Sequence, residues 1–106
     1  MHDLWLARFN EEILPIIIEK FKPSKVLFFG SRVSGAADED SDIDIIIISK
    51  EFKCIPFVNR MAKILNLAQF PKHVDYLCYT PEEFDNVKDS SVVIENALEN
   101  YIEAIL

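Results

Sequence analysis

The part of the chain that decides the fold is residues 30–48, which read GSRVSGAADEDSDIDIIII. The segment begins at Gly30, one of only two glycines in the chain, and contains the other, Gly35. It ends in an aliphatic run whose β-branched residues favour a strand buried on both faces, which we expect over residues 43–49. The segment therefore predicts a tight turn, a polar loop over residues 37–41, and then a buried strand.

Two further strands are predicted on either side of this segment. Residues 25–29 form a short apolar run that stops at Gly30, and residues 74–79 form another. The connection between the second and third strands is long enough to contain a crossover helix, so we expect those two strands to be parallel.

Helices are predicted between and around these strands. Helical spacing of apolar residues covers residues 3–20, where Pro15 is expected to kink or split the helix, and residues 56–69. Thr80-Pro81 begins a further helix, and a last helix is expected over residues 90–106. The order α-β-α-β-α-β-α-α predicts an α/β (α+β) fold with a three-stranded mixed sheet covered by helices.

Length and charge limit what the protein can do. The chain has 106 residues and is expected to form a single domain over 1–106. Its net charge of −7 argues against direct nucleic-acid binding, which usually needs a basic surface. A phosphate-rich ligand would need a divalent cation between it and the acidic protein. Without a signal peptide or an apolar run of membrane length, we expect a cytoplasmic protein.

Three aspartates are candidate metal ligands. Asp42 and Asp44 are two residues apart at the entry to the second strand, so their side chains share a face. Two like charges beside an apolar core are unfavourable unless a cation compensates, and the cation is either a metal ion or Arg32. Asp75 is the second residue of the third strand, where it is a further ligand or a carboxylate facing water. Parallel strands would bring all three to one end of the sheet.

The Gly30-Ser31 pair follows the first strand and precedes a short predicted helix over residues 31–37. Backbone N–H groups at such a junction favour a phosphate, although a plain tight turn explains the glycine equally well. Neither His2 nor His73 has a spacing that predicts a metal ligand.

Gly30-Ser31, ten further residues and then Asp42-Ile43-Asp44 resemble the signature of the polymerase-β-like nucleotidyltransferase superfamily. Within it, the chain is most similar to the minimal nucleotidyltransferase proteins, many of which are antitoxins of HEPN-domain toxins. The resemblance covers about residues 24–88, and Asp75 stands where the family has its third carboxylate.

The resemblance implies a function for each of these positions. Gly30 and Ser31 would bind the terminal phosphates of ATP, and Arg32 would contact the leaving phosphates or lie exposed. Asp42, Asp44 and Asp75 would be the catalytic residues and would hold two Mg²⁺ ions. The expected reaction is transfer of AMP from ATP to a hydroxyl, by resemblance a tyrosine of a HEPN-type toxin.

Two other functions remain open at this point. One is a non-catalytic, antitoxin-like binding module that neutralises its partner by occlusion, and the other is a transferase that acts on RNA ends or a small molecule. The C-terminal segment, residues 90–106, has more apolar positions than one helix face needs. It packs on the sheet or contacts a protein, either a second copy of the chain or a toxin-type partner.

Overall fold

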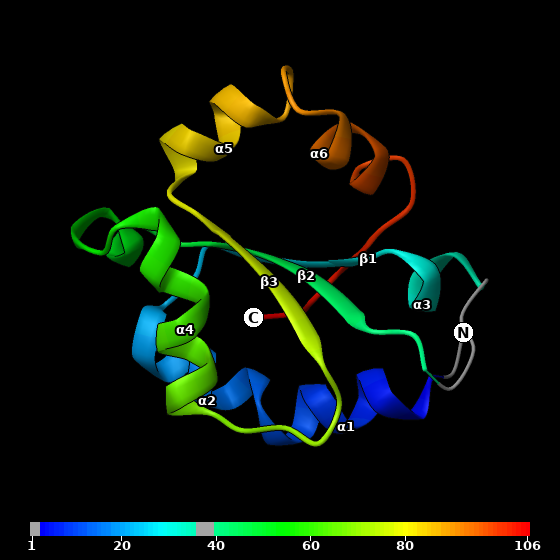
Figure 1. The fold of residues 1–106 in the computed structure, drawn as a ribbon. Helices are drawn as coiled ribbons and strands as arrows, with labels where there is room; N and C mark the ends of the chain where they lie inside the picture. The colour runs from blue at the N-terminus through cyan, green and yellow to red at the C-terminus, as the bar shows by residue number, and fades with distance from the viewer. Residues whose placement is uncertain (1–2, 36–39) are drawn as a thin grey trace.

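The centre of the molecule is a mixed sheet with strand order β3-β2-β1-β4 (Figure 1). The structure is a computed structural model and describes residues 3–35 and 40–106. The strands are β1 (Lys25–Phe29), β2 (Ile43–Ile48), β3 (Val74–Tyr79) and β4 (Ile102–Glu103). β1 pairs antiparallel with β2, and β2 pairs parallel with β3. The three predicted strands and the parallel crossover are confirmed.

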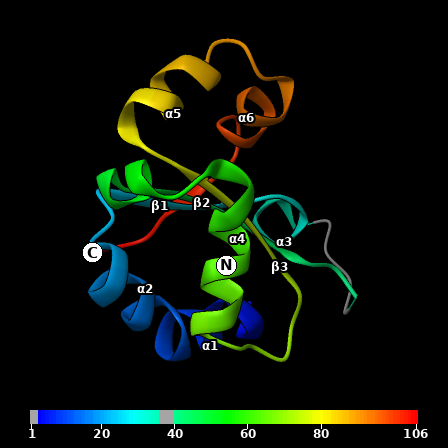
Figure 2. The ribbon, with the colours of Figure 1, turned by 60° about the vertical axis from the view of Figure 1, so that its left-hand side comes forward.

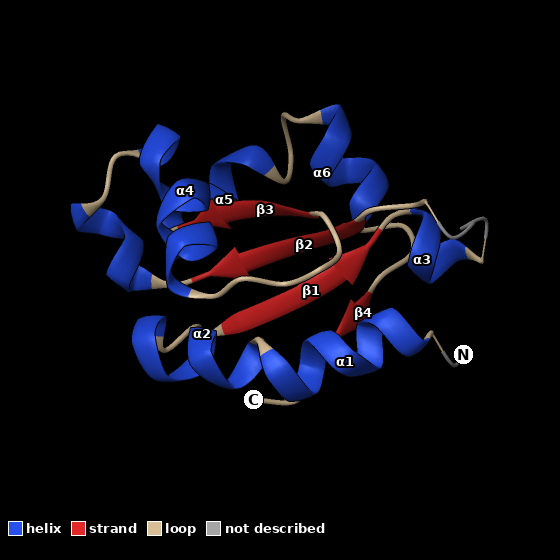
Figure 3. Cartoon of the chain, turned by 60° about the horizontal axis from the view of Figure 1, so that its bottom comes forward, coloured by secondary structure: helices blue, strands red, loops and turns tan. Residues whose placement is uncertain are grey.

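The sheet has a fourth strand, so the prediction of a sheet of only three strands is wrong, and so is that of a continuous helix over residues 90–106. Helix α6 (Val92–Ala97) is short, and the chain then returns to the sheet as β4. β4 pairs antiparallel with β1, with Phe28 opposite Ile102 (Figure 3). Apolar spacing alone could not distinguish helix from strand here, because the unpaired edge of β1 that β4 covers forms only in the folded chain.

Helices cover both faces of the sheet. They are α1 (Leu4–Glu12), α2 (Leu14–Phe21), α3 (Ser31–Ser34), α4 (Phe57–Leu67), α5 (Pro81–Val87) and α6, with a 3-10 helix, η1 (Lys50–Cys54). α1, α2 and α4 lie on one face, and α5 and α6 lie on the other (Figures 1 and 2). Pro15 is in the first turn of α2, so the predicted split of the first helix is confirmed. None of the helices in the described ranges has the length and apolarity needed to cross a membrane.

The buried strand β2 separates two hydrophobic cores. Ile43, Ile45 and Ile47 pack with α1, α2 and α4, whereas Ile46 and Ile48 pack with α6. Since side chains alternate along a strand, Asp44 lies on the same sheet face as Ile46, the face that α5 and α6 cover. Most of the loop predicted over residues 37–41, which leads into β2, lies outside the described residues.

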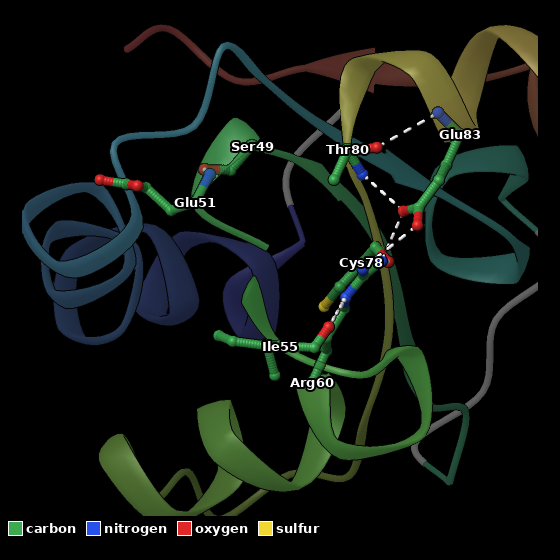
Figure 4. Close-up of polar contacts among 7 residues, drawn as sticks. All are labelled: Ser49, Glu51, Ile55, Arg60, Cys78, Thr80 and Glu83. Atoms are coloured by element: carbon green, nitrogen blue, oxygen red, sulfur yellow. Dashed lines mark hydrogen bonds and ion pairs between the residues drawn. The ribbon is translucent and has the colours of Figure 1, made fainter. Parts of the chain in front are cut away.

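A buried arginine joins the two helical layers at the end of β3. The side chain of Arg60 on α4 is 4% exposed and forms an ion pair with Glu83 on α5 at 2.5 Å. It also donates to the backbone carbonyls of Ile55 at 2.9 Å and Cys78 at 3.1 Å (Figure 4). Glu83 in turn completes a capping box with Thr80, which confirms the helix start predicted at Thr80-Pro81.

Replacement of this arginine is expected to destabilise the fold. Arg60→Ala would leave the Ile55 and Cys78 carbonyls and the Glu83 carboxylate without their donor. We expect a loss of about 2 kcal/mol in the free energy of unfolding, at the low end for a buried pair because Glu83 is 40% exposed. Urea titration measures the loss. Lys88→Ala, which removes an exposed ion pair with Asp85, is the control and should cost less than about 0.5 kcal/mol. Equal losses in the two variants would contradict the assignment.

Candidate active site

The three predicted aspartates meet at the edge of the sheet where β2 and β3 begin. Asp44 is the register partner of Asp75 across the parallel pair. On its other side Asp44 is opposite Phe29, the last residue of β1. Asp42 immediately precedes β2, and His73 immediately precedes β3. The convergence expected from the sequence is therefore observed.

Asp42, His73 and Asp75 form a group that is able to hold a cation. One ligand atom from each lies within 4.8 Å of the others. His73 Nε2 is 2.9 Å from Asp75 Oδ1, and their side chains are 58% and 48% exposed. Two carboxylates and one imidazole are ordinary ligands for a divalent metal, so the residues present fit such an ion.

The sequence analysis missed His73. A signal was present, because His73 precedes Asp75 by two residues and an extended chain places residues with that spacing on one face. That spacing relates His73 to Asp75, whereas His2 is remote from both in the sequence.

Asp44, like Asp42 and Asp75, is only partly accessible. Burial raises its pKa, and the negative charges of Asp75 and Asp42 and a hydrogen bond with Asp75 raise it further, to about 6. The nearby His73 opposes this shift only in part. Ionisation of Asp44 is unfavourable because two other carboxylates lie nearby. A cation bound among the three would stabilise their ionised forms.

Gly30 leaves the space that the Asp44 carboxylate occupies. Its φ of 80° and ψ of −163° form a backbone conformation that is almost restricted to glycine. A Cβ at this position would overlap Oδ2 of Asp44 and lie 3.0 Å from its Cγ. The Gly30 carbonyl accepts hydrogen bonds from the N–H groups of Val33 and Ser34 at the start of α3. Gly30 thus turns the chain into α3 and lets β1 approach Asp44 closely.

Arg32 is buried, so the alternative of an exposed arginine is wrong. Its side chain is 6% exposed and forms an ion pair with Asp3 at 2.9 Å. It also donates to the carbonyl of Ser41, the residue before Asp42. Asp3 caps α1 by accepting from the N–H groups of Trp5 and Leu6. Arg32 therefore links the start of α1 to the backbone that leads into the acidic edge.

The pKa of Asp3 reflects this contact. Burial alone would raise it, but the hydrogen bond from Arg32, the backbone N–H groups of Leu6 and Trp5 and the arginine charge outweigh burial. The pKa of Asp3 is consequently below its ordinary value. Asp3 is ionised at neutral pH and holds the arginine in place.

Comparison with known proteins places this chain in a family. A family model described as a nucleotidyltransferase domain matches residues 11–103. The chain is also similar to a protein of Methanocaldococcus jannaschii named "putative protein adenylyltransferase", with 33% identity over 63 residues. That alignment covers 59% of this chain, and the chain spans only 59% of the length of that relative.

Solved structures with similar folds include the crystal structure of a "putative nucleotidyltransferase" from Sulfolobus solfataricus. The TM-score is 0.61 at 31% identity, with 80% of this chain and 75% of the other covered. BolA1 from Arabidopsis thaliana has a TM-score of 0.54 at 17% identity, with 77% of this chain and 98% of the other covered. At that identity, the second likeness concerns the arrangement of helices and strands alone.

The two glycines are expected to respond differently to alanine. Gly35 has a φ of 89° but open space around it. Gly35→Ala should therefore lower the free energy of unfolding only by the strain of alanine in a left-handed conformation, about 1 kcal/mol. Gly30→Ala also displaces the Asp44 carboxylate and should cost about 3 kcal/mol. Urea unfolding of both variants measures the difference. In an Asp44→Ala background the cost of Gly30→Ala should fall, and equal costs in both backgrounds would argue against the contact.

The raised pKa of Asp44 predicts a pH-dependent gain in stability for Asp44→Asn in buffer containing a chelator. Between the ordinary pKa of 3.8 and about 6, the folded chain holds a proton that the unfolded chain has lost. The Asp44 charge therefore lowers the stability of the wild type progressively as pH rises through this range, and the penalty is complete above pH 6.

Asp44→Asn should raise the Tm by a few degrees at pH 7.5, and the gain should shrink toward pH 4. Thermal unfolding followed by circular dichroism measures it. Asp85→Asn, at an exposed position on α5, is the matched control and should show no such trend. A gain for Asp44→Asn that does not change with pH would contradict the assignment of the charge.

Proposed function

Because the chain belongs to the nucleotidyltransferase domain family, we propose that it transfers AMP from ATP to a hydroxyl group of a protein. The observation that carries the proposal is the meeting of Asp42, Asp44 and Asp75 at one edge of the sheet, beside Gly30. The name of the Methanocaldococcus relative supports a protein acceptor.

We propose a role in binding ATP or the cations for each residue of the site. Gly30 and Ser31, at the junction of β1 and α3, bind the terminal phosphates of ATP through the backbone and the serine hydroxyl. Asp42, Asp44 and Asp75 hold two divalent cations, with Mg²⁺ as the ion that the resemblance implies. When bound, the cations neutralise the phosphates and stabilise the charge that develops on the leaving group.

The proposed reaction exchanges one bond at phosphorus for another. The acceptor hydroxyl oxygen forms a bond to the α-phosphorus of ATP, and the bond from that phosphorus to the α,β-bridging oxygen breaks. Pyrophosphate leaves, and the carboxylate of Asp75 orients the hydroxyl and takes its proton. Asp75 suits this part because its side chain is 48% exposed and therefore accessible to an acceptor.

Two roles are considered for Arg32 in this reaction. The family resemblance implies contact with the leaving phosphates. The ion pair with Asp3 and the hydrogen bond to the Ser41 carbonyl favour a positioning role, in which Arg32 holds the backbone that leads into Asp42 against the start of α1. We favour positioning, because a side chain that is 6% exposed is already held by two partners.

The proposed acceptor is a tyrosine of a HEPN-type toxin, with this chain as its antitoxin. The net charge of −7 disfavours a nucleic-acid acceptor. Apolar side chains near the C-terminus are exposed and would suit a protein contact; they are Val92 (70%), Val93 (59%) and Ile105 (96%). The same surface would serve a partner that is neutralised by occlusion, so the experiment has to separate transfer from binding.

Intact-mass spectrometry of a co-purified partner tests the proposal. The chain is co-expressed with a HEPN-family protein from the same organism, purified as a complex, and incubated with ATP and Mg²⁺. We expect the partner to gain the mass of one adenylyl group. The gain should disappear with Asp42→Asn and with Asp44→Asn, because each removes a proposed cation ligand, and should persist with Asp85→Asn.

Two outcomes would contradict the enzyme. One is a partner mass that does not change with ATP and any divalent cation. The other is neutralisation of the partner that survives Asp42→Asn and Asp44→Asn together without a mass change, which would indicate occlusion.

A further inference from the structure

We propose that His73 is a nitrogen ligand of the cation held by Asp42 and Asp75, and that this position prefers Mn²⁺ to Mg²⁺. The inference rests on the proposed function, since it concerns one of the cations that function requires. The inference adds one ligand, His73, to the three aspartates of the proposed site, and it adds a preference for Mn²⁺.

The position of the imidazole supports a ligand. His73 and Asp75 come from β3 and the residue before it, whereas Asp42 comes from the lead-in to β2. A nitrogen of His73 and one oxygen from each aspartate lie within 4.8 Å of one another, so a small shift of these exposed or partly exposed side chains brings all three to a single ion. Asp44, the register partner of Asp75, adds a third carboxylate beside them.

A hydrogen bond alone is a weaker explanation of the His73 position. His73 Nε2 lies 2.9 Å from Asp75 Oδ1, but the two side chains are 58% and 48% exposed. Exposed pairs of this kind contribute little to stability. The hydrogen bond also does not explain why the same imidazole lies close to Asp42, which is on the other strand.

The choice of metal follows from the ligand atoms. Mg²⁺ strongly prefers oxygen ligands and retains its waters, whereas transition metals accept imidazole nitrogen readily. Mn²⁺ accepts both carboxylate and imidazole ligands. A position made of two carboxylates and one imidazole should therefore gain affinity for Mn²⁺ from the nitrogen and gain almost none for Mg²⁺.

Pulsed electron paramagnetic resonance of Mn²⁺ bound to the purified chain tests the inference. The sample contains no nucleotide, because adenine nitrogens would couple to manganese. We expect electron-spin-echo modulation from a directly bound nitrogen in the wild type and its loss in His73→Gln. The chain has two histidines, so His2→Gln is the matched control and should retain the modulation.

Affinities provide the second readout. Mn²⁺ titration should give a dissociation constant about tenfold weaker for His73→Gln than for the wild type. Mg²⁺ affinity, measured by displacement of Mn²⁺, should change little, so the ratio of the two affinities should fall. His73 is exposed at the sheet edge, and circular dichroism confirms that the variant remains folded.

Three outcomes would overturn the inference: no Mn²⁺ binding by the wild type, bound Mn²⁺ without nitrogen modulation, and modulation that survives His73→Gln. Equal losses of Mn²⁺ and Mg²⁺ affinity in His73→Gln would also overturn it, since they would indicate that His73 only orients Asp75. These results are distinct from failure of the proposed function. That function fails if the chain transfers no AMP, and this outcome does not depend on whether His73 binds the cation.

Discussion

Two partnered positions of a parallel strand pair, 44 and 75, both carry aspartate, and a third carboxylate precedes one of the strands. Partial burial, together with repulsion from these neighbouring carboxylates, raises the pKa of Asp44 to about 6. Neighbouring charges of one sign oppose folding. Here the isoleucines of β2, which are fully buried or nearly so in the cores on both sheet faces, offset that cost by fixing the strand that carries Asp44.

Carboxylates at the two ends of the sheet have different surroundings. At the end of β3, the carboxylate of Glu83 is neutralised by Arg60, and the pair joins α4 to α5. Near the beginning of β2, Arg32 forms an ion pair with Asp3 and donates to the Ser41 carbonyl. One end is thus stabilised by the chain's own cation. The other end concentrates negative groups around a position that a metal ion suits.

The glycine beside this edge connects the fold to the proposed chemistry. Gly30 ends β1, adopts a conformation that other residues rarely adopt, and leaves the space taken by the Asp44 carboxylate. The turn that we propose to bind phosphate and an aspartate that we propose to bind metal are therefore neighbours in the fold. Membership of the family supports nucleotidyl transfer. The acceptor depends on surfaces in which relatives can differ. The alignment with the Methanocaldococcus protein covers only 59% of that relative.

The sequence by itself determined the three principal strands, the split helix at Pro15, the helix start at Thr80 and the three carboxylates. These features depend on local spacing, on proline and capping chemistry, and on the side-chain alternation of extended chains. The tertiary structure alone decided that residues 102–103 form a strand, because their hydrogen-bonding partner is the distant β1. It also decided that Arg32 is buried against Asp3 and that His73 lies beside Asp42, since both contacts join segments about thirty residues apart in the sequence. Local periodicity carries no information on which distant segments become neighbours; packing of the whole chain decides it.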